Sequence, residues 1–275
     1  MKELDLTQGS VPKVLLHFAV PFLLANVLQA LYGGADLFVV GQYDDAASVA
    51  AVAIGSQVMQ TVTGVILGLT TGITVLIGIA TGAKDDRKTA SIVGTGIWLF
   101  AVVAAVLTAL MVALHGQIAV WMHTPVEAMR DTEAYLWICS MGIPFIIGYN
   151  VVCGILRGLG DSRTPLYFVA LACVLNIVLD FILVGACGMR AAGAAAATVT
   201  AQGVSFATAF GFLYRKGFHF EFTRRDIRPV RALCRQMTLL GAPIALQDLL
   251  VNLSFLLITV IVNGMGGGFG CFGSR

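Results

Sequence analysis

Charged residues are scarce in this chain of 275 residues: Asp, Glu, Lys and Arg make up only 12%, whereas hydrophobic residues make up 58%. Soluble domains carry about 25% charged residues, so the composition excludes an ordinary soluble protein and indicates a polytopic membrane protein. Cysteines with CxxC or zinc-ligand spacing are lacking as well, and Cys139, Cys153 and Cys173 fall inside apolar stretches. We therefore expect reduced, structural cysteines and no disulfide framework.

Motifs for catalysis and for nucleotide binding are also missing. The chain has no GxxxxGK[ST] loop to cradle phosphates, which excludes ATP as a driving force on this chain. The histidines lie near the ends of apolar stretches or in loops, without a paired Ser, Cys or metal ligand; they are His17, His115, His123 and His219. We therefore expect neither an enzyme nor a bound cofactor, and no nucleic-acid partner.

Apolar windows long enough to cross about 30 Å of hydrocarbon, roughly 20 residues each, occur seven times. They cover residues 14–41, 48–80, 91–115, 134–156, 165–187, 191–214 and 236–263. The second window contains Gly64, Gly68 and Gly72 at a spacing of four, a small-xxx-small face that lets a neighbouring backbone approach closely. The sequence therefore predicts an all-α integral membrane protein, a polytopic bundle of seven transmembrane helices.

Basic residues are concentrated on one side of the predicted spans. Fourteen Lys and Arg residues fall on the side of the N-terminus and of the loops at 82–90, 157–164 and 215–235. Arg130 and Arg190 fall on the other side, and only Arg275 lies beyond the last span. By the positive-inside rule, this asymmetry predicts a multi-pass protein of the cell membrane whose N-terminus is cytoplasmic.

The fifth span, LYFVALACVLNIVLDFILVGA, carries Asn176 and Asp180, which share one helix face. A carboxylate at the centre of a bilayer helix costs roughly 2.5 to 3.5 kcal/mol even on mild insertion scales, so an ionisable residue there indicates a functional site. A hydrogen bond between helices is the alternative explanation for Asn176. Counted inward from the outer ends, Asp36, Asp180 and Thr198 lie roughly 12 to 15 Å deep and Gln57 roughly 18 Å deep. A shared depth is what a cavity requires.

A weak internal repeat appears when the chain is shifted by 222 residues, which places Pro21 on Pro243. The first six spans then form one lobe, and the seventh begins a second, parallel-related lobe. We predict a six-helix N-terminal lobe at 1–214, a cytoplasmic linker at 215–235 and the first helix of an incomplete second lobe at 236–275. The seventh helix should lie apart from the other six. The last residues, GMGGGFGCFGSR, lack helical periodicity, so we expect a truncated or frame-shifted C-terminus.

Three stretches carry a resemblance to a known family. The first span, VPFLLANVLQALYGGADLFVVGQY, has a single acidic residue, Asp36; GLTTGITVLIGIATGAKDD joins the second span to the first basic loop; and LRGLGDSRTPL joins the fourth span to the fifth. In this order they resemble the multidrug and toxic compound extrusion (MATE) transporters, over essentially residues 8–265. The resemblance implies export of large, amphipathic, often cationic small molecules across the lipid bilayer, driven by inward movement of H+ or Na+.

The resemblance also implies roles for individual residues. Four polar positions match those that many prokaryotic members use for cation coupling: Asp36, Asn176, Asp180 and Thr198. The coupling ion, as Na+, would be the one metal expected. Two further candidates for cavity or substrate contacts do not come from the resemblance: Gln57 is selected by its depth, and Asp248 has no secure counterpart in the family. For Asp248 a capping or pairing role has an equal claim. Family members have twelve helices in two lobes, whereas this sequence stops after the seventh.

Two other classes were weighed. A related flippase or polysaccharide exporter would share the architecture, but such proteins usually line the cavity with basic groups, and here the span interiors lack Lys and Arg and hold acidic residues. A seven-helix receptor or retinal pump is disfavoured because its N-terminus lies outside and because the seventh span has no Lys for a Schiff base. We therefore expect an antiporter for cationic cargo.

Overall fold

The computed structural model describes residues 11–217, 222–223 and 226–269, which are helical apart from short connections. The elements are α1 (Val11–Tyr43), α2 (Ala46–Gly82), α3 (Asp86–Trp121), α4 (Val126–Gly158), α5 (Arg163–Asp180), the π-helical segment η1 (Phe181–Ala186), α6 (Arg190–Lys216) and α7 (Arg231–Phe269). All seven predicted spans are confirmed. Most helices begin before and end after the predicted windows, because polar turns outside the apolar core continue the helix. The side chains of Asp45 and Asp85 cap the starts of α2 and α3, because they accept hydrogen bonds from the backbone amides of Ser48 and Lys88.

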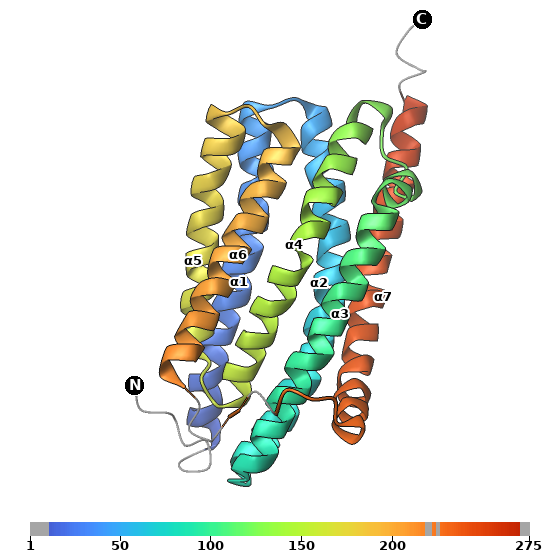
Figure 1. The fold of residues 1–275 in the computed structure, drawn as a ribbon. Helices are drawn as coiled ribbons and strands as arrows, with labels where there is room; N and C mark the ends of the chain where they lie inside the picture. The colour runs from blue at the N-terminus through green and yellow to red at the C-terminus, as the bar shows by residue number, and fades with distance from the viewer. Residues whose placement is uncertain (1–10, 218–221, 224–225, 270–275) are drawn as a thin grey trace, which may run out of the picture.

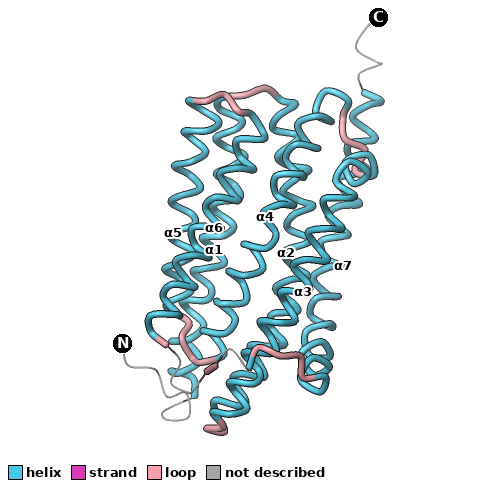
Figure 2. The backbone as a smooth tube through the Cα atoms, viewed as in Figure 1, coloured by secondary structure: helices cyan, strands magenta, loops and turns pink. Residues whose placement is uncertain are grey.

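The helices stand side by side, and α4 lies in the middle (Figures 1 and 2). Helix α4 packs against α2, α3 and α6, and it is the most buried of the seven. On one side of it, α1 packs against α5, and α5 packs against α6. On the other side, α2 carries α7 along its length, and α3 also contacts α7. The seven helices therefore form one bundle, with α4 at its centre and α7 at its edge.

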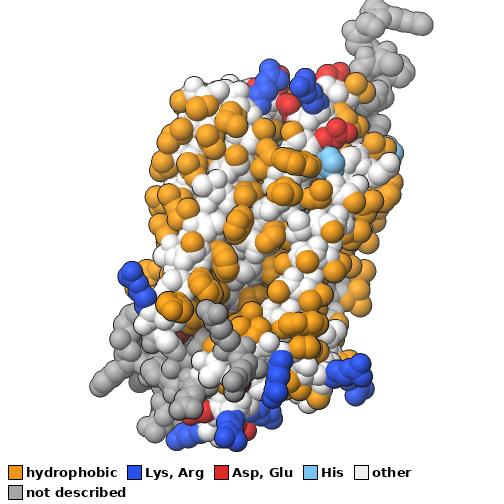
Figure 3. Space-filling view, in the orientation of Figure 1, with side chains coloured by type: hydrophobic (Ala, Val, Ile, Leu, Met, Phe, Trp, Pro, Cys, Tyr) orange, Lys and Arg blue, Asp and Glu red, His pale blue; other side chains and the backbone are white. Residues whose placement is uncertain are grey.

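Charged side chains gather at the two ends of this bundle, with an apolar belt between them (Figure 3). We call the end that carries the α2–α3 and α4–α5 connections the basic end, and the end that carries the α1–α2 and η1–α6 connections the Arg190 end. Large apolar side chains such as Leu23, Phe38 and Val106 are more than half exposed on the belt. Lipid, rather than water, is the solvent that accommodates such a surface, and helices satisfy their backbone hydrogen bonds without water. The chain is therefore a multi-pass membrane protein.

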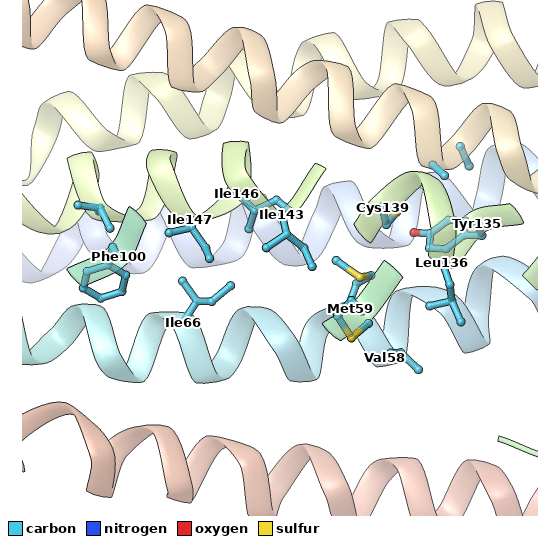
Figure 4. Close-up of a cluster of buried hydrophobic side chains, with 14 of the residues drawn as sticks. Val58, Met59, Ile66, Phe100, Tyr135, Leu136, Cys139, Ile143, Ile146 and Ile147 are labelled. Atoms are coloured by element: carbon cyan, nitrogen blue, oxygen red, sulfur yellow. The ribbon is translucent and has the colours of Figure 1, made fainter. Parts of the chain in front are cut away.

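The core lies between α2, α3 and α4 (Figure 4). Ile66, Ile143 and Ile147 are fully buried there and Phe100 nearly so. Near the basic end of this seam the hydroxyl of Thr74 donates to the backbone oxygen of Gly154 at 3.1 Å, which is possible because Gly154 has no side chain to hold the helices apart. The close contact of α2 with α4 fixes the wall on which the polar residues of both helices are displayed.

Helix α7 packs closely against α2 because glycines of α2 line the contact. A Cβ at Gly68 or Gly72 would overlap backbone atoms of Ala245 or Met237, and one at Gly64 would lie 3.1 Å from Nδ2 of Asn252. The predicted small-xxx-small face of α2 is thus confirmed. The prediction that the seventh helix lies apart from the other six is wrong, because this glycine face gives its backbone a close contact surface.

The helical bounds of α7 correct a second expectation. The stretch GMGGGFG was expected to lack helical structure, yet the helix continues to Phe269. An apolar environment favours this, because a backbone that leaves the helix loses hydrogen bonds that lipid cannot replace. Residues 218–221 and 224–225 of the predicted linker, and residues 270–275, lie outside the described residues. The division into two lobes therefore stays a prediction.

At the Arg190 end, one arginine has three acidic neighbours. Arg190 lies 3.8 Å from Asp44, 3.6 Å from Asp45 and 3.9 Å from Asp131, measured between side-chain nitrogen and oxygen atoms. Ser48 donates its hydroxyl to Asp131 at 3.2 Å. The amide of Ser48, more than the charge of Arg190, holds the pKa of Asp45 below its usual range. Ion pairs of a half-exposed arginine add little free energy individually, but these three join the α1–α2 connection, α4 and the start of α6.

Candidate ion and substrate site

Three helices bring four polar side chains to one buried point. Asp36 comes from α1, Asn176 and Asp180 from the end of α5, and Thr198 from α6. The hydroxyl of Thr198 donates to Oδ2 of Asp36 at 3.2 Å, and Nδ2 of Asn176 donates to the Thr198 hydroxyl at 3.3 Å. The carboxyl group of Asp180 is the immediate neighbour of that of Asp36. The structure thus brings together the three residues that the sequence placed at one level of the membrane, and Asn176 with them.

Burial makes it costly for the carboxyl groups of this cluster to be charged. The exposed fractions are 3% for Asp36, 1% for Asn176 and 0% for Asp180, so water reaches none of them freely. Four oxygen atoms lack any hydrogen-bond partner: Oδ1 of Asp36, Oδ1 of Asn176 and both carboxyl oxygens of Asp180. Two adjacent carboxylates cannot both stay charged in such a place without a compensating partner. A shared proton, or a small cation that takes oxygen ligands, is what this arrangement can hold.

A cavity of about 300 Å³, which we call the inner cavity, opens in front of the cluster. Asp36 and Thr198 line it, whereas Asn176 and Asp180 lie behind them and do not. Its other polar lining side chains are Gln29, Tyr32, Ser56, Gln60, Thr63, Tyr135, Asn150, Gln202 and Asn252. Asp36 therefore borders the cavity and Asp180 lies behind it, so a ligand in the cavity meets only one of the two carboxyls directly.

Tyr32 and Gln202 extend the cluster toward α6, and sequence reasoning missed both. Nε2 of Gln202 and the hydroxyl of Tyr32 are 3.5 Å apart, and Oε1 of Gln202 is buried without a partner. Gln202 follows Thr198 by four residues and Tyr32 precedes Asp36 by four, so each lies one helical turn from a predicted site residue. That spacing was the signal in the sequence that could have found them.

A second cavity, which we call the vestibule, continues from the inner cavity toward the basic end. It has a volume of about 580 Å³ and shares Gln29, Leu67 and Asn150 with the inner cavity. Arg157 and Ser162, at the basic end of α4 and in the connection to α5, line its far part. A polar route thus runs from the basic end of the bundle to Asp36.

The two further candidates lie in different places. Gln57 is half-buried and is not among the residues that line the inner cavity; Gln60, on the next turn of α2, lines it instead. Asp248 of α7 lines the vestibule and lies against α2, since a Cβ at Gly64 would lie 3.4 Å from the Cβ of Asp248. The structure therefore places Asp248, but not Gln57, on the polar route.

The helix that carries Asp180 changes type at this residue. Helix α5 ends at Asp180, and η1 continues it as a π-helix as far as Ala186. The sequence predicted one regular helix over 165–187, because a π-helical segment has the same apolar composition as an α-helix. Such segments are rare and are often found at functional sites.

Comparison with known proteins identifies the family. The family model MatE matches residues 21–182. The probable multidrug resistance protein YpnP of Bacillus subtilis (strain 168) is 33% identical over 269 residues, which cover 97% of this chain and 59% of that protein. The probable multidrug resistance protein NorM of Thermotoga maritima is 27% identical, over 92% of this chain and 55% of that protein. The chain thus spans a little over half the length of these relatives.

Solved structures agree with this. A crystal structure of MATE in complex with MaD3S matches with a TM-score of 0.83 and 27% identity, over 90% of this chain and 56% of that one. An outward-facing multidrug resistance MATE family transporter matches with a TM-score of 0.83 and 26% identity, over 90% of this chain and 56% of that one. The second of these structures is named as a transporter, and the two relatives are named as probable multidrug resistance proteins. The chain belongs to the MATE family.

Proposed function

We propose that this chain forms the first lobe, and the first helix of the second lobe, of a secondary active antiporter of the cell membrane, which exports amphipathic, cationic small molecules in exchange for H+ or Na+. One observation carries the proposal: the buried carboxyl pair of Asp36 and Asp180, with unpartnered oxygens, lies at the floor of a polar cavity. The multidrug names of the relatives support the substrate class. The distribution of basic residues supports a cytoplasmic N-terminus.

The geometry supports exchange because cargo and coupling ion meet at one carboxyl group. Asp36 borders the inner cavity and is also the neighbour of Asp180. A cationic compound in the cavity neutralises Asp36 from the front, and H+ or Na+ neutralises the pair from within. Because the cationic compound and the coupling ion both neutralise Asp36, they compete for it. When the site opens alternately to the two sides of the membrane, this competition leads to exchange of the compound for the ion.

The test measures binding of a fluorescent lipophilic cation to the purified chain at several pH values and Na+ concentrations. Asp36→Asn and Asp180→Asn remove one charge each at nearly constant volume. We expect either change to abolish the dependence on H+ or Na+, and Asp36→Asn also to weaken cation binding by about tenfold or more. Asn176→Ala and Thr198→Ala remove neutral partners and should weaken the ion dependence by about two- to tenfold.

The matched control is Asp86→Asn, which makes the same chemical change on an exposed residue at the basic end. This variant should retain the cation affinity and the ion dependence of the unmodified chain. If Asp180→Asn folded normally and kept the full ion dependence, Asp180 would be a packing residue and the proposed coupling site would be wrong.

A further inference from the structure

The vestibule differs from the inner cavity in carrying a positive charge. Arg157 is the one Lys or Arg among the residues described as lining either cavity. It lies in the last turn of α4 and is half-buried. The sequence had assigned this residue to a loop and found no basic group within the spans, so the charge on the cavity wall was not expected.

Arg157 is held in place by an aromatic ring. Its guanidinium carbon lies 5.4 Å from the centre of the Phe22 ring on α1, a cation–π distance that orients the side chain across the vestibule. Within the described part of the chain no carboxylate forms an ion pair with it, in contrast to Arg190, which has three acidic neighbours. A half-buried, unpaired guanidinium has two parallel N–H groups to offer to a planar anion.

Two hydroxyl groups line the vestibule together with Arg157, and that of Tyr149 has no hydrogen-bond partner. The hydroxyl of Tyr149 is buried, with 2% of the residue exposed, and has no hydrogen-bond partner. Tyr149 and Arg157 lie two turns apart on α4 and line the same cavity. Ser162 is 7% exposed, lines the same cavity and makes no capping hydrogen bond to α5 although it precedes that helix. An unpartnered buried donor is costly unless a ligand satisfies it.

The remainder of the vestibule suits the rest of an amphipathic molecule. Apolar surface comes from Phe22, Leu67 and Val169, and Asp248 supplies a carboxylate from α7. A volume of about 580 Å³ lies in the range of pockets for drug-sized ligands. The wall thus offers a cation and hydroxyl donors, an apolar surface, and an acidic side chain.

We propose that the vestibule is a subsite for compounds that carry a carboxylate on an apolar body, with the carboxylate bound by Arg157 and hydrogen-bonded by Tyr149 and Ser162. The inference rests on the proposed export function and adds a substrate feature to it: a cationic compound that also carries a carboxylate binds more tightly than the same compound with that group blocked. Asp36 and Asp248 receive the positive end, and Arg157 receives the negative end.

The test compares one zwitterionic amphipathic compound with its methyl ester, which keeps the cation and the apolar body. Binding to the purified chain is measured by isothermal titration calorimetry in neutral detergent. The unmodified chain should bind the zwitterion at least about tenfold more tightly than the ester, because a charge-assisted hydrogen bond contributes that much. Arg157→Gln should remove this preference and leave the affinity for the ester unchanged, which also reports that the variant is folded.

Three further variants sharpen the result. Arg157→Lys keeps the charge without the paired N–H groups and should retain part of the preference. Tyr149→Phe should reduce it by a few-fold. Arg163→Gln is the control, because it removes a charge at the same end of the bundle from an exposed residue that does not line the vestibule. This variant should keep the full preference for the zwitterion. An unchanged preference in Arg157→Gln would overturn the inference while leaving the ion dependence of ester binding, and hence the proposed function, untouched.

The lipid bilayer could supply the same anionic chemistry from a headgroup, so the measurement is repeated in nanodiscs of phosphatidylcholine and of phosphatidylglycerol. The proposal expects the preference for the zwitterion in both. If phosphatidylglycerol displaced the zwitterion from the unmodified chain but had no such effect in Arg157→Gln, the subsite would belong to a lipid headgroup and the proposal would be overturned.

Discussion

Replacing Gly241 by alanine tests the seat of α7 on α2. A Cβ at this position would lie 2.8 Å from Cα of Leu69, 2.9 Å from the backbone oxygen of Leu69 and 3.1 Å from that of Gly68. All three distances are below 3.4 Å, at which ordinary contact begins, and all three atoms belong to the backbone, which cannot rotate away as a side chain can. One added methyl group must therefore push α7 off α2.

The size of the effect follows from two opposing contributions. Overpacking of this kind costs about 1 to 3 kcal/mol, whereas alanine in place of glycine in a helix interior adds about 0.5 to 1 kcal/mol of stability. We expect a net loss of about 1 to 2 kcal/mol. For a chain of this size the midpoint of thermal unfolding should fall by about 2 to 8 °C.

The assay is thermal unfolding of the purified chain in detergent, followed by circular dichroism. Gly211→Ala on α6 is the matched control, because a Cβ there has nothing within 4 Å, so the same substitution should leave the midpoint unchanged or raise it by a few degrees. If Gly241→Ala unfolded at the same temperature as Gly211→Ala, α7 would not lie against α2 as described.

Two further predictions concern the ends of the bundle. The hydrogen bond from the Ser48 amide is the main reason why the pKa of Asp45 is lowered. The charged Asp45 therefore stabilises the folded chain fully above the ordinary aspartate pKa of about 4, and this stabilisation is lost as the pH falls through the lowered pKa. Asp45→Asn should therefore flatten the pH dependence of the unfolding midpoint below about pH 4, and an unchanged slope would contradict this. A cysteine at position 86 should resist impermeant maleimides added outside intact cells, and labelling there would reverse the predicted orientation.

The seven spans could be predicted because apolar length determines what can cross a bilayer, and that quantity is written directly in the sequence. Counting residues inward from the charged ends also placed Asp36, Asp180 and Thr198 at one level. Depth alone does not say which way a side chain faces. This is why Gln57, at a similar depth, was selected, although Gln60 on the next turn lines the cavity.

The features that could not be predicted depend on contacts between helices. Arg157 lies in the last turn of α4, where hydropathy assigns a loop, and only the packing of α1, α2 and α5 around it makes a cavity wall of that turn. The place of α7 was misjudged for a related reason. The glycine face of α2 was recognised from its spacing, but the sequence does not state which of six neighbours will occupy such a face.

The change from α-helix to π-helix at Asp180 has a mechanical consequence. A π-helical turn contains an extra residue, and a return to α-type hydrogen bonds would swing the residues after it by about 100° around the helix axis. Segment η1 contacts both α1 and α6, the helices that carry Asp36 and Thr198. The paired carboxyls therefore adjoin a segment with one residue more per turn than an α-helix, and a return to α-type hydrogen bonds there would change its contacts with the two helices that carry Asp36 and Thr198.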